Sequence, residues 1–259
     1  MTLDVTSLTI DIGGSRVVDD LSFSVADGER LGLIGESGSG KSLSILALIG
    51  LAPDEATITG SVVLDGTEIL GLPERALARI RGSRIGSVFQ DPLTSLNPLH
   101  TIGRQIAEPF RLHDKLGKGD ARARAVEAAR EVGLPDPEHV VDLFPHQLSG
   151  GQRQRVGIAI AIARRPTLLL ADEPTTALDV TTQAEILELF RRLTDEHGMS
   201  LVFVTHDLAV LAQITSEVVV LSHGRAVERG AVSRILASPV DPVTQGLVRA
   251  ARETTWSAS

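Results

Sequence analysis

The sequence predicts an α/β protein in which a mostly parallel sheet is covered by helices. Short, nearly continuous apolar runs recur along the chain, and such runs are typical of strands buried on both faces. Stretches with helical character separate these runs, and this alternation builds parallel sheets. The expected strands cover residues 30–34, 167–171, 201–205 and 218–221, and the expected helices cover residues 42–50, 149–164, 181–196 and 207–214.

The N-terminal part of the chain is expected to form a different, antiparallel sheet. Apolar residues alternate with polar ones over 3–12 and 17–25, and Gly13 and Gly14 join the two stretches. Such alternation predicts half-buried strands connected by a tight turn. Residues 58–64 predict a further strand of this part.

The middle of the chain differs in composition from the parts on either side. Residues from about 91 to 147 are rich in Ala, Arg, Glu and His, carry helical patterns at 101–112 and 118–132, and contain several prolines as breakers. We interpret this stretch as an inserted helical subdomain. The predicted organisation is a core at 1–90 and 149–237, a helical subdomain at 91–148, and a short C-terminal tail at 238–259, loose from residue 253.

Composition excludes several classes of protein. The chain of 259 residues carries 25 Lys+Arg against 33 Asp+Glu, a net charge of −8, which disfavours binding to nucleic acid. Cysteine is absent, which excludes disulfides, thiolate metal sites and cysteine nucleophiles. The longest apolar stretch is far shorter than the ~20 residues that a bilayer helix needs. The N-terminus shows no signal-peptide pattern, so a cytoplasmic chain is expected.

A glycine-rich segment fits the phosphate-binding pattern G-x-x-x-x-G-K-[ST], between an expected buried strand and a helix. Its glycines let backbone N–H groups turn toward phosphate, and the helix N-terminus favours an anion. A chance match has a probability of about one in a hundred, and a Rossmann site would need a third glycine where Leu43 stands. The residues expected to bind nucleotide here are Gly35, Glu36, Ser37, Gly38, Ser39, Gly40, Lys41, Ser42 and Leu43.

Two adjacent carboxylates, Asp172 and Glu173, end the expected strand at 167–171. Neighbouring strand residues point to opposite faces, so the two groups can act differently. In P-loop enzymes an Asp in this place holds Mg²⁺, and Glu173 would polarise the attacking water as a general base. The alternative is a solvated acidic turn, since Pro174 follows directly.

A second helix start, Leu-Ser-Gly-Gly-Gln at 148–152, has features that suit an anion. Ser149 is an N-cap residue type, and Gly150 and Gly151 permit close backbone approach. An ordinary capped helix is the plainer interpretation. Because the chain has one carboxylate pair but two phosphate-type loops, the simplest account is that this loop, Gln152 included, completes a site on another subunit.

Together these motifs make the chain resemble the nucleotide-binding subunit of an ATP-binding-cassette (ABC) transporter. The glycine-rich loop, the acidic strand end and the 148–152 signature match that family. Gln90, Asp179 and His206 resemble its Q-loop, D-loop and switch residues, and all motifs occur in the family's order. The resemblance covers residues 1 to about 235.

The resemblance implies a P-loop NTPase core, with ATP and Mg²⁺ bound and ATP hydrolysed to ADP and phosphate. Lys41 would reach the β/γ-phosphates. Glu173, His206 and Gln90 would be catalytic, and Asp179 would join the nucleotide site. Without the family pattern, a lone Gln after a strand is more often a surface residue, and a lone His is more often a structural hydrogen bonder. The implied metal ligands are Ser42, Gln90 and Asp172.

Four further segments, at 89–98, 144–149, 171–180 and 238–242, resemble ATPases of peptide and nickel importers. This implies two membrane-spanning permease subunits, a second ATPase that is identical or a paralogue, and, indirectly, an external substrate-binding protein. The expected location is peripheral, on the cytoplasmic face of the bacterial inner membrane. The loop at 91–99 would dock against a cytoplasmic helix of the permease.

The sequence departs from this group in two respects. Its members commonly carry a C-terminal extension with a cysteine cluster, and this sequence has no cysteine. Ile12 stands where the family usually has an aromatic residue stacked on adenine, which predicts weaker nucleotide affinity. The alternatives are a soluble cassette ATPase of DNA repair or translation, an exporter half, and a non-hydrolysing module. These would ordinarily show a coiled-coil insertion or second cassette, fused membrane helices, or loss of Glu173 or His206, respectively.

Overall fold

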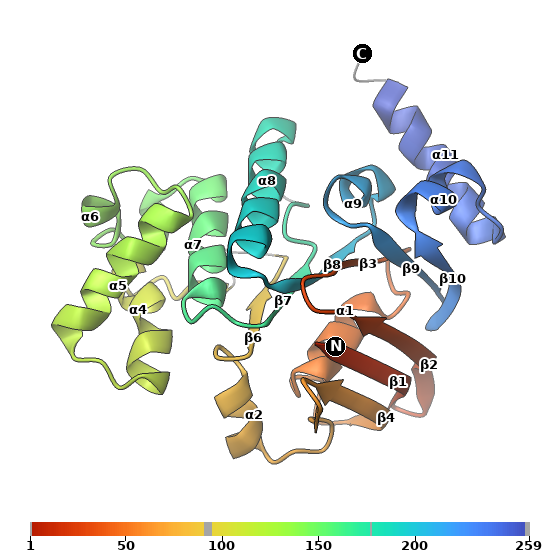
Figure 1. Cartoon of the computed structure of the whole chain (residues 1–259), viewed down its shortest axis with the longest axis horizontal. Coiled ribbons are helices and arrows are strands. Elements are labelled where there is room, and N and C mark those ends of the chain that lie inside the picture. The colour runs from red at the N-terminus through yellow and green to blue at the C-terminus, as the bar shows by residue number, and fades with distance from the viewer. Residues whose placement is uncertain (1, 91–94, 177, 257–259) are drawn as a thin grey trace. The chain divides into compact units, whose positions relative to one another are not determined.

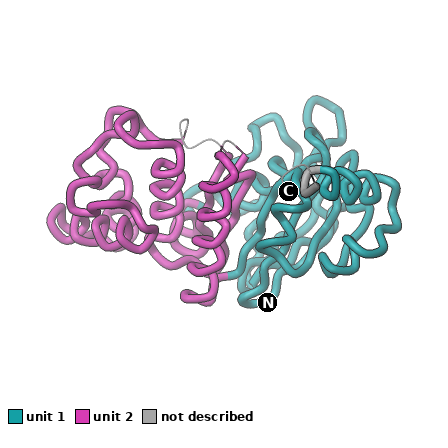
Figure 2. Tube along the Cα trace, turned by 90° about the horizontal axis from the view of Figure 1, so that it is seen from above, with its two compact units in different colours: residues 1–77, 200–259 teal, residues 78–199 magenta. Residues whose placement is uncertain are grey.

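The computed structural model describes residues 2–90, 95–176 and 178–256, the side chains of 254–256 excepted. The chain divides into two compact units (Figure 2). Unit 1 comprises Met1–Leu77 and Ser200–Ser259, and unit 2 comprises Ala78–Met199. The predicted division into a core and a subdomain at 91–148 follows other boundaries and stays a prediction.

Unit 1 begins with an antiparallel sheet in the strand order β2-β1-β4-β5. Apolar side chains alternate into its buried face, as the sequence pattern predicts, and Leu3, Leu8 and Ile10 are fully buried. Register shifts interrupt the pairing of β1 with both of its neighbours. The strands are β1 (Leu3–Ile12), β2 (Ser15–Val25), β4 (Ala56–Leu64) and β5 (Thr67–Glu68).

The second group of strands in unit 1 is mostly parallel. Strand β3 pairs in parallel with β8 on one side and with β9 on the other, and β10 adds to β9 in the antiparallel direction. Every residue of β8 is buried, which confirms the prediction drawn from its continuous apolar run. The bounds are β3 (Arg30–Gly35), β8 (Ser200–Thr205), β9 (Glu217–Ser222) and β10 (Arg225–Ala231).

Helices cover these parallel strands. A buried cluster joins Ile34 of β3 and Val218 of β9 to side chains of the last three helices. Figure 1 shows α9, α10 and α11 close to β9 and β10. The helices of unit 1 are α1 (Lys41–Leu48), α9 (Leu208–Ile214), α10 (Val232–Ala237) and α11 (Pro242–Trp256), and α2 (Glu74–Ile80) lies where the first segment of this unit ends.

The C-terminal segment differs from the prediction. The expected short tail at 238–259 contains α11, which runs to Trp256 and contributes Val248 and Ala251 to the buried cluster. The carboxylate of Glu228 accepts hydrogen bonds from the backbone N–H groups of Val240 and Asp241 and so anchors the start of this helix. The expectation of a loose end from residue 253 stays a prediction, since α11 runs to Trp256 and residues 257–259 lie outside the described residues.

Unit 2 combines a pair of parallel strands with helices. Strand β6 (Ile85–Val88) pairs with β7 (Leu168–Asp172). The helices predicted at 101–112 and 118–132 are present within a residue at each end. The helical elements are α4 (Ile102–His113), α5 (Lys118–Glu131), α6 (Pro137–Val140), the 3-10 turn η1 (Pro145–Gln147), α7 (Gly150–Ile162) and α8 (Val180–His197). None of the helices described is both long and apolar enough to cross a bilayer.

Candidate nucleotide site

The glycine-rich loop of unit 1 connects β3 to α1, as predicted. Gly40 is the N-cap of α1, with φ 97°, and no side chain caps this helix. A Cβ at Gly40 would approach Val18 Cγ2 to 3.0 Å and Val17 O to 3.1 Å. Both the left-handed backbone and the close contact therefore require glycine here.

Lys41 lies almost entirely inside this loop, with 4% of its surface exposed. Its ammonium group donates to the carbonyl oxygens of Gly35 (2.7 Å) and Glu36 (2.8 Å), and lies 3.4 Å from Ser39 Oγ. A buried charge is costly unless it is hydrogen-bonded, and these oxygens meet that need. The lysine is thus fixed at the turn where a phosphate group would bind, whereas Ser42 is exposed at the start of α1.

The loop is supported by parts of unit 1 that are distant in sequence. The N–H of Gly224, in the turn between β9 and β10, donates to Ser39 O at 3.2 Å. A Cβ at Gly35 would come within 2.2 Å of Leu221 O on β9, so a larger residue cannot stand there. Nothing in the local motif identifies these supports, because they depend on the pairing of β9 with β3.

His206 comes to the same end of the sheet as the glycine-rich loop. Ile34 pairs with Thr205 in the parallel register of β3 and β8, so Gly35, the last residue of β3, and His206, the first after β8, lie at adjacent strand ends. The ring is exposed, which leaves it accessible to a ligand. The next residue, Asp207, caps α9 by accepting from Ala209 N at 2.7 Å. Sequence reasoning did not single out Asp207, although an Asp before an apolar run is a helix-start signal.

Ile12 ends β1 beside the turn at Gly13 and Gly14, paired with Ser15 and Ala56. Its side chain is half-buried. An aliphatic group on a hairpin can offer an apolar face to a base, but it supplies no aromatic stacking. Its assignment as the adenine contact stays a prediction.

Unit 2 brings together Gln90, Asp172 and Glu173. Val88 pairs with Ala171, so the residues that follow β6 and β7 come side by side at the carboxyl ends of these parallel strands. Ligands bind at such ends in α/β sheets. Asp172 is buried, with 6% exposed, whereas Gln90 is exposed.

Glu173 has a strained backbone. Its φ of 46° lies in the left-handed region, which costs a non-glycine residue about 1 kcal/mol. The side chain is half-buried, and its Oε2 accepts from Thr176 Oγ1 at 3.0 Å. Strain of this kind is found where the surrounding structure holds a residue for a function. The next part of the loop includes Ala177, which is outside the described residues.

The signature segment begins α7 with a reciprocal cap. Ser149 Oγ accepts from the N–H of Gln152 at 3.2 Å, and Gln152 Oε1 accepts from the N–H of Ser149 at 2.8 Å. This confirms Ser149 as the N-cap. A Cβ at Gly151 would come within 2.6 Å of Thr182 Cγ2, whereas Gly150 is nearly open, with its nearest neighbour at 4.0 Å.

Asp179 is the N-cap of α8. It accepts from Thr182 Oγ1 at 2.7 Å and from Thr182 N at 3.0 Å. The hydrogen bond from the Thr182 hydroxyl is the largest cause that lowers the pKa of Asp179 below its ordinary value of 3.8. The side chain is exposed at the N-terminus of the helix, so a nucleotide can reach it as well.

The expected metal ligands offer a hydroxyl, an amide and a carboxylate, which are all oxygen donors. Among the described residues, no three His, Asp or Glu side chains form a ready-made cage for a metal. Mg²⁺ is commonly held by one or two carboxylates together with substrate phosphates. The donor set of Ser42, Gln90 and Asp172 fits that mode.

Comparison with known proteins establishes the family. The family model described as ABC transporter matches residues 18–176. The dipeptide transport ATP-binding protein DppD of Haemophilus influenzae is 45% identical over 97% of this chain and 78% of its own length. A probable peptide ABC transporter ATP-binding protein, y4tR of Sinorhizobium fredii, is 44% identical over 96% and 76%. The peptidoglycan transport ATP-binding protein YejF of Agrobacterium fabrum is 48% identical over 91% of this chain, and the chain spans 44% of its length.

Solved structures agree with the sequence relatives. The ATP-binding cassette MJ0796, in a dimeric post-hydrolysis state bound to ADP and Pi, superposes with a TM-score of 0.78 at 31% identity, covering 89% of this chain and 98% of its own. The cassette cbiO1 from Clostridium perfringens gives a TM-score of 0.78 at 27% identity, covering 92% and 91%. The chain belongs to the ABC transporter family and has the P-loop NTPase fold of its ATPase cassettes.

Proposed function

We propose that this chain is the ATP-hydrolysing subunit of a peptide importer, converting ATP and water to ADP and phosphate. The observation that carries the ATPase part is the glycine-rich loop, in which an uncapped helix start and a buried, carbonyl-bound Lys41 lie at the carboxyl end of β3. The peptide part rests on relatives named for peptide or dipeptide transport at 44% and 45% identity over nearly the whole chain.

In this proposal the site residues divide the tasks of binding and hydrolysis. Lys41 and the N–H groups of 35–43 hold the phosphates, and His206 orients the attacking water at the γ-phosphate. Glu173 accepts the proton of that water as general base. Gln90 contacts the metal and the water, while Ser42 and Asp172 hold Mg²⁺. When bound there, Mg²⁺ would supply positive charge beside the phosphates. Residues 149–152 and Asp179 serve the nucleotide of a second ATPase subunit.

The proposed partners are that second subunit and the membrane-spanning permease, with an external binding protein acting indirectly. Residues 95–99 at the end of the loop proposed to dock on the permease are described, and Leu99 is 81% exposed. Residues 91–94 of that loop lie outside the described residues. The proposed location is peripheral, at the cytoplasmic face of the bacterial inner membrane.

The decisive enzymatic test is Glu173→Gln. The variant should bind ATP and dimerise in its presence, yet hydrolyse it at least about 100-fold more slowly, because a general base contributes this much. ATP binding is measured by fluorescence, dimerisation by gel filtration and hydrolysis by phosphate release. The matched control is Lys115→Gln, an exposed lysine outside the site, which should behave as the unsubstituted chain. Hydrolysis at the normal rate in Glu173→Gln would remove this residue from the general-base role.

The cargo is tested separately. A strain lacking the gene should lose uptake of labelled di- or oligopeptide, and the chain should restore it, whereas Lys41→Ala should not. Nickel uptake is measured in the same strains. Loss of nickel uptake with normal peptide uptake would replace the peptide assignment by nickel, and normal uptake of both would reject import of either.

A further inference from the structure

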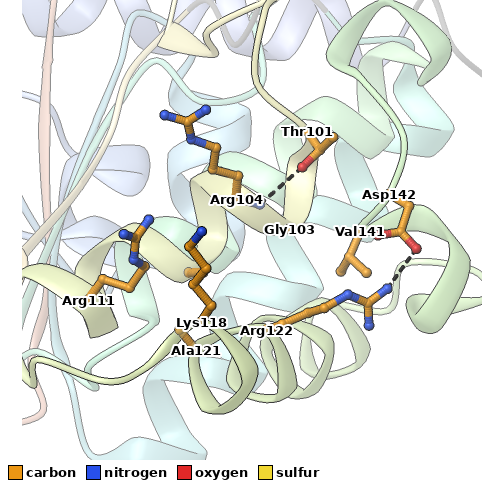
Figure 3. A pocket seen from close by; sticks show the side chains of 10 residues that line it. Thr101, Gly103, Arg104, Arg111, Lys118, Ala121, Arg122, Val141 and Asp142 are labelled. Atoms are coloured by element: carbon orange, nitrogen blue, oxygen red, sulfur yellow. Dashed lines mark hydrogen bonds and ion pairs between the residues drawn. The ribbon is translucent and has the colours of Figure 1, made fainter.

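A cavity of about 470 Å³ lies within unit 2, and no residue expected in the nucleotide site lines it. Helices α4 and α5 form its walls, and Val141 and Asp142, which follow α6, complete its lining. Its volume is within the range of pockets that hold small organic molecules. Figure 3 shows the side chains that line it.

The floor of the cavity is apolar and closely packed. It is made of Gly103, Ala107, Ala121 and Val141, all of which are buried. The N–H of Gly103 donates to Val141 O at 2.7 Å, and a Cβ at Gly103 would come within 2.8 Å of Val141 Cβ. Small side chains on both helices therefore create the hollow, and it is part of the packed fold.

The rim of the cavity is cationic. Arg104 and Arg111 lie about two turns apart on one face of α4, and Lys118 and Arg122 lie one turn apart on α5. Figure 3 draws Arg104, Arg111 and Lys118 toward one side and the pair of Arg122 with Asp142 (2.6 Å) toward the other. Asp142 is the acid that lines the cavity, whereas Glu108 and Asp120 of the same helices do not line it.

None of the three cations on that side has an ion pair among the described residues, which also holds for Lys115 and Arg165 of unit 2; what sets the three apart is that they rim one hollow. Elsewhere in unit 2, Arg124 pairs with Glu127 at 3.2 Å and Arg164 with Asp114 at 2.6 Å. Three cations around one apolar hollow, without a carboxylate partner among the described residues, make the local field positive, and this favours an anionic ligand.

We propose that this cavity, the cationic pocket, binds a phosphate-bearing organic anion. Arg104, Arg111 and Lys118 would hold the phosphate, since guanidinium and ammonium groups are the usual partners of phosphate oxygens. The floor of small apolar residues would take the organic part. A soluble phosphate ester and the headgroup of an anionic phospholipid share this chemistry.

The test is titration of the full chain with phenyl phosphate, scored by calorimetry with Mg–ADP present so that the glycine-rich loop is occupied. Saturable binding should weaken about tenfold or more in Arg104→Gln/Lys118→Gln, because charge-assisted hydrogen bonds are lost. Arg124→Gln, an exposed arginine of α5 outside this pocket, is the matched control and should bind normally. A second arm measures sedimentation with vesicles of phosphatidylglycerol and of phosphatidylcholine.

The outcomes are distinct. Pocket-dependent binding of phenyl phosphate supports a soluble ligand, and pocket-dependent sedimentation with phosphatidylglycerol alone supports a lipid headgroup. Equal binding by the double variant and the unsubstituted chain, or no saturable binding in either arm, overturns the proposal. Because the double variant changes exposed side chains, its fold is checked by circular dichroism, and Arg111→Gln provides an independent variant of the same rim.

Discussion

Helices α1 and α7 both begin at a glycine-containing loop of the kind that binds anions. The two helix starts differ in whether a side chain caps the first turn. The first turn of α1 has no side-chain cap, its N-cap Gly40 is left-handed, and Lys41 donates back to the loop carbonyls. The first turn of α7 is closed by the reciprocal bonds of Ser149 and Gln152. An uncapped helix start leaves its orphan N–H donors to a ligand, whereas a capped one satisfies part of them internally.

The capped start of α7 can still serve a phosphate. A serine hydroxyl accepts and donates at once, so Ser149 can take the N–H of Gln152 while its own proton points to a ligand. The comparison therefore separates two designs: α1 depends on backbone geometry, and α7 depends on one hydroxyl with two roles. Each design predicts a different response to substitution.

The largest effect is expected for Gly40→Ala. The left-handed backbone and the contacts with Val17 and Val18 should cost about 1–3 kcal/mol in the free energy of unfolding, and nucleotide binding should be lost with the loop geometry. Urea denaturation and ATP titration measure the two effects. Gly66→Ala, at φ 76° in a turn with open space around it, is the control for backbone strain alone. Normal ATP affinity in Gly40→Ala would contradict the dependence of α1 on its backbone.

Ser149 allows capping and ligand binding to be separated. Ser149→Ala should lose about 1 kcal/mol of stability through the missing cap. Ser149→Asp should retain the cap and the stability, but should slow ATP hydrolysis because it offers a negative charge in place of a donor. Thermal unfolding and phosphate release are measured on both variants. If Ser149→Asp hydrolyses ATP normally, the hydroxyl does not contact phosphate.

A smaller gain is expected for Ile12→Tyr. An aromatic ring at the end of β1 should stack on adenine and tighten ATP binding by up to about tenfold, since such stacking contributes ~0.5–1.5 kcal/mol. The ATP dissociation constant of the variant is compared with that of Ile12→Leu, which keeps an aliphatic face. An unchanged or larger dissociation constant for Ile12→Tyr refutes the assignment of this position to adenine. The affinity for ATP then comes from the phosphate loop and not from a contact at position 12.

The smallest effect concerns α8, a third helix start, which is capped by the exposed carboxylate of Asp179. Because the pKa of Asp179 is lowered below 3.8 in the folded chain, its contribution is complete above that value and is lost as the pH falls through the folded pKa. The side-chain amide in Asp179→Asn should still cap α8, but it does not gain a proton in this acidic range. The stability difference between the two chains, from urea denaturation, should thus be constant near neutral pH and change only in acid, as the pH falls through 3.8 toward the lowered pKa of the folded chain. A difference that varies near neutral pH would show that another group is responsible.

What could be predicted from the sequence is what depends on neighbouring residues. Apolar runs specify the buried strands, periodicity specifies α4 and α5, and Ser149 specifies the start of α7, because propensity, burial and capping act over a few residues. The phosphate loop can also be predicted from the local sequence, because its glycines and its lysine lie in one contiguous turn.

Tertiary structure decided what depends on distant partners. The pairing of Ile34 with Thr205 places His206 beside the phosphate loop, and the pairing of Val88 with Ala171 places Gln90 beside the carboxylates. The C-terminal helix packs through Glu228 and the buried cluster, and these contacts cannot be predicted from a local sequence pattern. The cationic pocket exists because Gly103 lets α4 approach Val141. Such features follow from packing between segments far apart in sequence, whose register and approach local residue preferences do not specify.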